Sequence, residues 1–189
     1  MEASVTFKAV GKAIGNKTLL ADLSFGVEKG STFVLIGENG SGKSLILKLL
    51  VGLIEKDTGS VYIHGQDINT RSLETRSLCG YMPQIVNLDD DLNIFDNISI
   101  YGQLHGLSND EANKNTLHWI ELLGFTQFLN HPIKDLPYGI KRKILFARAL
   151  VHDPPVLLLD EPTTGMDPHS RSAVWNILDK LHHSKTIIF

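Results

Sequence analysis

The sequence predicts an α/β protein with a mostly parallel sheet at its core, an N-terminal antiparallel β part and an inserted helical lobe. The first 28 residues alternate between apolar and polar side chains around a turn at Gly15, which favours antiparallel strands. Residues 93–128 carry apolar side chains at helical intervals. Parallel strands that are covered on both faces are continuously apolar. Such runs occur at residues 32–36, 156–159 and 186–189.

The elements follow from these patterns and from the turn residues between them. We expect strands, in chain order, at residues 4–10, 23–27, 32–36, 61–65, 156–159 and 186–189. We expect helices at residues 44–53, 142–151 and 171–181, in addition to those within 93–128. The sheet-forming start, the helical middle and the return to alternating strands and helices indicate an α/β core that carries an insertion.

Length, charge and composition narrow the classes of function. The chain has 189 residues, which suggests one domain with room for a lobe. Its net charge of -3 gives no support for nucleic acid as a partner. Cys79 is the only cysteine, so a disulfide within the chain is impossible. No apolar run approaches the roughly 20 residues of a membrane span, and no signal peptide is visible. If this protein works at a membrane, other chains must span it.

A glycine-rich loop between the strand at 32–36 and the helix at 44–53 predicts a phosphate-binding site. Its spacing matches the P-loop pattern. Glycines allow successive N–H groups to surround an anion, and the following helix adds the positive end of its dipole. Lys43 supplies charge for the β- and γ-phosphates, and the Ser44 hydroxyl can ligate Mg²⁺. We expect Mg-ATP to be bound by Gly37, Glu38, Asn39, Gly40, Ser41, Gly42, Lys43 and Ser44.

Two consecutive carboxylates, Asp160 and Glu161, end the apolar strand at 156–159. A carboxylate that leaves a buried strand can hold magnesium across from a P-loop. A second carboxylate beside it can polarise the attacking water as a general base. Standing alone, the pair could be an acidic turn. Together with the P-loop, it predicts the second half of a hydrolytic site.

The order of short motifs resembles the nucleotide-binding domain of an ATP-binding cassette (ABC) transporter, over essentially the whole chain. The five matching segments are 37–44 (Walker A), 81–84 (ending in the Q-loop glutamine), 136–143 (the place of the signature), 157–162 (Walker B) and 164–168 (D-loop). The resemblance implies a P-loop NTPase core of the RecA-like type. It also implies that residues 1–189 form one ATP-binding domain with a helical lobe at about 85–142.

The resemblance implies a role for each site residue. Gln84 would contact magnesium and the attacking water and would couple the site to the lobe and its membrane partner. Glu161 would be the base, with Lys43 and Gln84 as the other catalytic residues. Two such domains would enclose two ATP molecules, so that Gly139 meets the γ-phosphate of the other subunit and Asp167 acts across the interface. The implied magnesium ligands are Ser44, Gln84 and Asp160.

Three features of the sequence depart from the family pattern. In the signature, Pro137 replaces the serine and Tyr138 replaces a glycine, which removes a hydroxyl and adds bulk. Ile14 stands where an aromatic residue stacks on adenine, and it lacks a π-face. The switch histidine would follow residues 185–189, and none of the eight histidines falls at that place. We therefore expect a domain that is short at its C-terminus.

The leading hypothesis is an ATPase subunit that couples Mg-ATP binding and hydrolysis at a dimer interface to transport through a separate membrane subunit. It would be cytoplasmic and peripheral on the inner face of the membrane, and its dimer could be a homodimer or a heterodimer. One alternative is a nucleotide-binding regulatory or structural subunit that hydrolyses little, because the signature is altered. Another is a non-transport ATPase of the same superfamily. Such ATPases often carry two of these domains in one chain, so the single short domain argues against this alternative.

Overall fold

The computed structural model describes residues 2–70 and 73–189, and the chain divides into two compact units. The first unit comprises Met1–Cys79, Pro155–Asp160 and His182–Phe189, and the second comprises Gly80–Pro154 and Glu161–Leu181. The chain passes between the units at four points, one of which is the peptide bond between Asp160 and Glu161.

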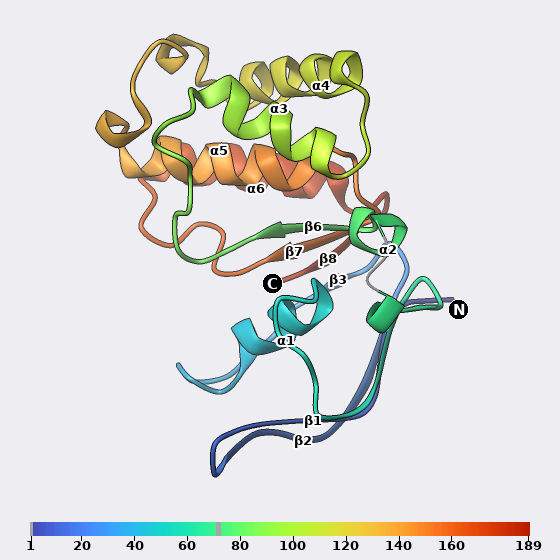
Figure 1. Cartoon of the computed structure of the whole chain (residues 1–189). Coiled ribbons are helices and arrows are strands. Elements are labelled where there is room, and N and C mark those ends of the chain that lie inside the picture. The colour runs from blue at the N-terminus through green and yellow to red at the C-terminus, as the bar shows by residue number, and fades with distance from the viewer. Residues whose placement is uncertain (1, 71–72) are drawn as a thin grey trace. The chain divides into compact units, whose positions relative to one another are not determined.

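An antiparallel sheet with the strand order β2-β1-β4-β5 forms one part of the first unit (Figure 1). Its strands are β1 (Ala3–Ile14), β2 (Lys17–Glu28), β4 (Thr58–Ile63) and β5 (Gln66–Asp67). The inward-facing side chains of β1 include Val5, Phe7 and Val10, which are buried. The Phe7 ring stacks on Phe25 with 4.6 Å between the centroids. The antiparallel N-terminal part is confirmed, although β1 and β2 are longer than the predicted 4–10 and 23–27.

A second sheet contains the parallel strands of the core. In its order β3-β8-β7-β6, the strands are β3 (Thr32–Phe33), β8 (Thr186–Ile188), β7 (Val156–Leu159) and β6 (Cys79–Met82). Strand β8 pairs in parallel with both β3 and β7. All residues of β7 are buried, as expected of a strand that is covered on both faces. The parallel core is thus confirmed, and β6 was not predicted.

The predicted strand at 32–36 is wrong beyond Phe33. The Leu35 N–H still donates to the Phe189 carbonyl at 2.6 Å. However, Val34 is 47% exposed and Ile36 is 92% exposed. This apolar run therefore leaves the covered part of the sheet on its way to the glycine-rich loop, and its composition alone does not reveal where it leaves.

The glycine-rich loop ends at helix α1 (Lys43–Leu50), which also belongs to the first unit. Five of its apolar residues, from Leu45 to Leu50, are buried, so the helix is fixed by packing immediately after the loop. It ends three residues earlier than predicted, and Gly52 follows with φ +69°. The short elements η1 (Ile68–Thr70) and α2 (Leu73–Ser77) complete this unit and were not predicted.

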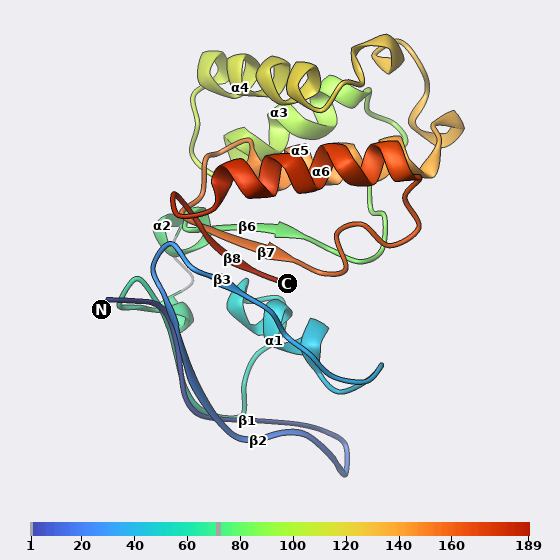
Figure 2. The ribbon, with the colours of Figure 1, turned by 180° about the vertical axis from the view of Figure 1, so that it is seen from behind.

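Helices dominate the second unit (Figures 1 and 2). They are α3 (Ile94–Leu104), α4 (Asn109–Leu122), η2 (Thr126–Phe128), η3 (Ile133–Asp135), α5 (Tyr138–Leu150) and α6 (Pro168–Leu181). Helix α5 contacts α3, α4 and α6, and its side chains from Ile144 to Ala147 are fully buried. Helix α4 begins with a capping box between Ser108 and Glu111, which satisfies N–H groups at the helix start.

Two helices start earlier than their apolar patterns predicted. Helix α5 begins at Tyr138 rather than Arg142, with Pro137 at the N-cap, and α6 begins at Pro168 rather than Arg171. A proline is tolerated at the start of a helix because its missing N–H would have no partner there. In the described residues, no helix combines the length and apolar character that crossing a membrane requires.

Candidate nucleotide-binding site

The backbone of loop 37–44 has the conformation that a phosphate-binding loop requires. Gly40 and Gly42 have φ values of +82° and +99°, which residues other than glycine rarely adopt. A Cβ atom on Gly37 would lie 2.6 Å from the Ser41 hydroxyl oxygen. Residues 37–41 are exposed, including Glu38 and Asn39. This exposed loop is therefore glycine-dependent, and it leads directly into the N-terminus of α1, which favours an anion.

The side chain of Lys43 is held against the loop by hydrogen bonds from its ammonium group. Its Nζ donates hydrogen bonds to the carbonyl oxygens of Gly37 at 2.6 Å and Glu38 at 2.8 Å. An ammonium group has three donors, so these contacts leave the group able to bind a phosphate oxygen as well. The two carbonyls hold the positive charge of Lys43 at the loop, as its predicted role requires.

Ser44 and Asp160 meet although they are far apart in the sequence. The Ser44 hydroxyl donates to Oδ1 of Asp160 at 2.9 Å. Ser44 lies in the first turn of α1, and Asp160 follows β7 and is only 5% exposed. Hydroxyl and carboxylate oxygens are the ligand types that Mg²⁺ prefers. The donor set and the glycine-dependent cradle therefore fit a magnesium-bound triphosphate. The first unit brings together the loop, Lys43, Ser44 and Asp160.

In the second unit, Glu161 and Gln84 are linked through their main chain. Glu161 has φ +49°, a left-handed conformation that costs a residue with a side chain about 1–3 kcal/mol. Its carbonyl accepts a hydrogen bond from Nη2 of Arg142 at 2.7 Å. Nη1 of the same arginine donates to the Gln84 carbonyl, also at 2.7 Å. The Gln84 side chain is exposed.

The sequence analysis missed the importance of Arg142, to which it gave no role beyond the start of the predicted helix at 142–151. Arg142 is fully buried. A signal was present, because Phe146 and Ala149 follow it by four and seven residues and lie on the same helical stripe. A charged side chain on a buried stripe requires several hydrogen-bond partners.

The altered signature packs against the D-loop segment of the same unit. A Cβ atom on Gly139 would lie 2.8 Å from Oδ2 of Asp167 and 2.9 Å from the Ser170 hydroxyl oxygen. One on Gly165 would lie 2.8 Å from the ring of Tyr138, and Gly165 has φ +74°. The bulk of Tyr138 is thus accommodated beside a glycine, and Tyr138 remains 46% exposed.

Asp167 has a local role in this unit. Its Oδ1 accepts a hydrogen bond from the Ser170 N–H at 2.9 Å, which caps the start of α6. The hydrogen bonds from the Ser170 main chain and side chain lower the pKa of the Asp167 carboxyl group. Its action across a dimer interface remains a prediction.

Ile14 is the last residue of β1, where it pairs with Lys17 across the turn, and it is 60% exposed. An exposed aliphatic side chain can pack against a purine without offering a π-face. Contact with adenine remains a prediction at this position.

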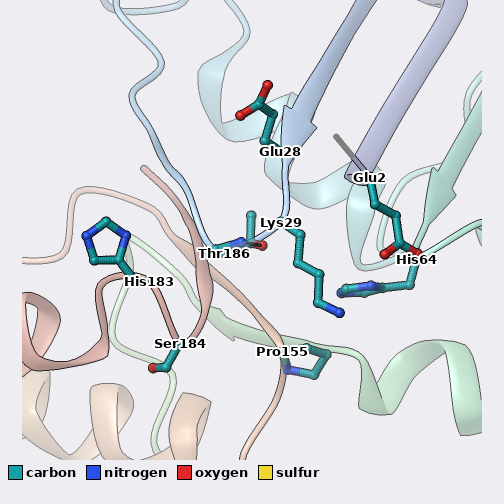
Figure 3. A pocket seen from close by; sticks show the side chains of 9 residues that line it. Glu2, Glu28, Lys29, His64, Pro155, His183, Ser184 and Thr186 are labelled. Atoms are coloured by element: carbon teal, nitrogen blue, oxygen red, sulfur yellow. Dashed lines mark hydrogen bonds between the residues drawn. The ribbon is translucent and has the colours of Figure 1, made fainter.

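A separate cavity of about 410 Å³ lies in the first unit, and none of the predicted nucleotide-binding residues lines it (Figure 3). Glu2, Lys29 and His64 bring charges of both signs to its wall. Burial lowers the pKa of His64, and the nearby charge of Lys29 lowers it further, while Glu2 opposes both. Glu28 adds a second carboxylate to this wall.

Comparison with known proteins adds an independent line of evidence. Residues 20–164 match the family described as ABC transporter. The chain is 37% identical, over 188 residues, to Nod factor export ATP-binding protein I of Paraburkholderia xenovorans (strain LB400). It is also 37% identical, over 187 residues, to the protein of that name from Burkholderia lata. These alignments cover 99% and 98% of this chain but 62% of each relative, so the chain spans less than two thirds of their length.

Solved structures share the fold. A dimeric ATP-binding cassette in a post-hydrolysis state, bound to ADP and Pi, matches with a TM-score of 0.88 and 26% identity. The match covers 97% of this chain and 86% of that one. The ATP binding subunit of an ABC transporter matches with a TM-score of 0.87 and 23% identity, over 97% of this chain and 78% of that one.

Proposed function

Since the chain belongs to the ABC transporter family, we propose that it is an ATP-binding subunit that couples Mg-ATP binding and hydrolysis to transport through a separate membrane subunit. The observation that carries this proposal is the 2.9 Å contact between Ser44 and Asp160 at the end of the glycine-dependent loop. It joins the two groups that would hold magnesium to the start of a helix that would hold phosphate. In this proposal residues 1–189 act as one ATP-binding domain with a lobe at about 85–142.

The proposed reaction is attack of water on the γ-phosphorus of ATP. The N–H groups of loop 37–44 and the Lys43 ammonium bind the phosphate oxygens. Ser44, Asp160 and Gln84 would hold magnesium, which would supply positive charge to neutralise the β- and γ-phosphates. Glu161 accepts a proton from the water as its oxygen bonds to phosphorus, and Gln84 orients that water. The bond from the γ-phosphorus to the bridging oxygen breaks, which leaves ADP and inorganic phosphate.

The proposed active form contains two ATP-binding domains, of the same or of different chains. The matched cassette bound to ADP and Pi is dimeric, which supports this arrangement. Gly139 would then approach the γ-phosphate of the partner domain, and Asp167 would act across the interface. The subunit would lie on the inner, cytoplasmic face of the membrane, with a transmembrane subunit as its other partner.

A second candidate is a nucleotide-binding regulatory subunit that hydrolyses little ATP, and one observation favours it. Pro137 occupies the N-cap of α5, where it makes no side-chain hydrogen bond. The serine usual at this place would present a hydroxyl to a γ-phosphate oxygen. Loss of a donor that acts on charge developing in the transition state slows the reaction more than it weakens binding.

Binding and hydrolysis by three variants test both candidates. Calorimetric titration of Lys43→Ala with Mg-ATP should show no measurable binding, because the main positive charge of the loop is gone. Lys17→Ala, which removes an exposed lysine from the start of β2, should bind like the parent. Normal binding by Lys43→Ala would refute the assigned site. Hydrolysis by the parent that disappears in Glu161→Gln supports the ATPase, whereas binding without hydrolysis in the parent supports the regulatory subunit.

A further inference from the structure

Arg142 is the fully buried charge of α5, and three of its hydrogen bonds go to main-chain carbonyls. Its Nη1 donates to the Pro83 and Gln84 carbonyls, and its Nη2 donates to the Glu161 carbonyl, each at 2.7 Å. No part of the side chain reaches the surface, since Arg142 is 0% exposed. Burying a guanidinium is unfavourable unless several strong acceptors surround it. These carbonyls provide such acceptors.

The three carbonyls belong to the two segments that carry the proposed water chemistry. Pro83 and Gln84 directly follow β6, and Glu161 lies two residues after the end of β7. Nearly 80 positions separate Gln84 from Glu161 in the sequence, yet one guanidinium bonds both main chains. A guanidinium is planar and presents its N–H groups in a fixed fork. It therefore sets the spacing between the two segments as well as satisfying their acceptors.

The backbone conformation of Glu161 needs support from its neighbours, and the hydrogen bond from Arg142 provides part of it. Its φ of +49° is unfavourable for a residue with a side chain. The surrounding contacts must hold such a residue in place. Its carbonyl accepts from Arg142 and also from the Thr164 N–H, the latter at 3.3 Å. The shorter, charge-assisted bond from Arg142 is the stronger of the two.

We propose that Arg142 is a positioning residue for ATP hydrolysis, which holds the main chains of Gln84 and Glu161 in one geometry. This inference rests on the proposed function, which assigns the water and the proton to these two side chains. Because Arg142 is buried, it acts through its hydrogen bonds to the main-chain carbonyls and not by contact with the reacting atoms. Gln84 and Glu161 carry the proposed water chemistry, so the loss of Arg142 affects turnover more than nucleotide affinity.

The test compares Arg142→Lys with the parent. Lysine keeps the charge but lacks the planar fork, so it cannot bond the same carbonyls in the same geometry. We expect kcat to fall about ten- to a hundredfold, as displacement of catalytic groups by about 1 Å does. The Kd for Mg-ATP should rise by a smaller factor than kcat falls, because loop 37–44, Ser44 and Asp160 are unchanged and only the predicted contact of Gln84 with magnesium is displaced. Arg142→Gln, which has fewer donors and no charge, should lose more of kcat than Arg142→Lys.

Asn115→Ala provides the matched control in the same unit. The Asn115 side-chain amide donates to the Val151 carbonyl at 2.8 Å, so this variant also loses a bond from a side chain to a main-chain carbonyl, but away from Gln84 and Glu161. Its kcat should equal that of the parent. A purely structural role for Arg142 would lower the melting temperature and leave kcat unchanged below it, and this result would overturn the proposal.

Amide hydrogen exchange separates failure of this inference from failure of the proposed function. In Arg142→Lys, exchange should accelerate in peptides that cover 83–87 and 161–165, while the rest of α5 stays protected. This measurement does not need hydrolysis. Unchanged exchange in both peptides of the folded variant overturns the positioning role. Equal hydrolysis by the parent and Glu161→Gln overturns the proposed function instead.

Discussion

Replacement of Ser44 by alanine tests the proposed magnesium site, because it removes the Ser44 hydroxyl oxygen, one of the proposed magnesium ligands. The variant removes the hydroxyl that donates to the buried Asp160 carboxylate at 2.9 Å. A hydrogen bond to a charged group contributes about 1.5–3 kcal/mol. The free energy of unfolding without nucleotide should therefore fall by about this amount, because the buried Asp160 carboxylate loses this hydrogen bond. Urea denaturation measures this first effect.

The same substitution should weaken the binding of Mg-ATP. If the lost magnesium ligand is worth as much as the lost hydrogen bond, affinity falls about ten- to a hundredfold, since about 1.4 kcal/mol corresponds to a factor of ten. ATP titrated in the presence of EDTA should bind Ser44→Ala and the parent about equally, within about twofold, because loop 37–44 and Lys43 remain. Isothermal calorimetry with and without Mg²⁺ separates the two contributions.

Ser44→Thr is the matched control, because it retains a hydroxyl at the same place and should keep the magnesium dependence of the parent. Ser41→Ala removes a hydroxyl from the exposed part of the loop and should change the magnesium dependence little. If Ser44→Ala binds Mg-ATP and free ATP with the parent's ratio of affinities, Ser44 is not a magnesium ligand, and the assignment of the pair with Asp160 fails.

Two further predictions concern stability. In Gly80→Ala, the new Cβ would lie 1.9 Å from the Ala149 carbonyl oxygen, so the free energy of unfolding measured in urea should fall by about 3 kcal/mol or more. The control is Gly26→Ala, whose Cβ would come no closer than 3.9 Å to another atom. Equal stability of the two variants would contradict the packing argument. Burial and the charge of Lys29 lower the pKa of His64 in the folded chain, so His64 takes up its proton at a higher pH in the unfolded chain. The stability that is present above about pH 6.5 is therefore lost as the pH falls through that value toward the folded pKa. His64→Gln should reduce this loss in thermal melts between pH 7.5 and 5, and an unchanged pH profile would exclude His64 as its source.

The parts of the fold that could be predicted are those in which local pattern and burial agree. The continuous apolar run of β7 is buried throughout, and the alternating N-terminal segment forms the antiparallel strands β1 and β2. The apolar run at 32–36 failed because the exposure of Ile36 depends on where the chain leaves the sheet. Strand β6 was missed because its four residues, Cys79–Met82, include a glycine and lack a clear apolar pattern.

The candidate site was predictable where side chains carry its chemistry. The spacing of Lys43 and Ser44 after the glycines and the carboxylate that ends β7 are visible in the sequence, and the pair of Ser44 and Asp160 meets in the first unit. The main-chain contacts were not predictable in this way. Every residue has a carbonyl, so the sequence does not mark Pro83, Gln84 and Glu161 as the acceptors of one arginine.

This difference separates affinity from turnover in the proposed enzyme. Side-chain contacts in the first unit hold Lys43, Ser44 and Asp160, the groups assigned to phosphate and magnesium. Main-chain contacts with Arg142 in the second unit hold Gln84 and Glu161, the groups assigned to water. The two sets are joined covalently at Asp160 and Glu161, where the backbone becomes left-handed. Ser44→Ala should therefore act mainly on the Kd for Mg-ATP, and Arg142→Lys mainly on kcat. A substitution of either kind that altered both equally would show that the two sets do not act separately.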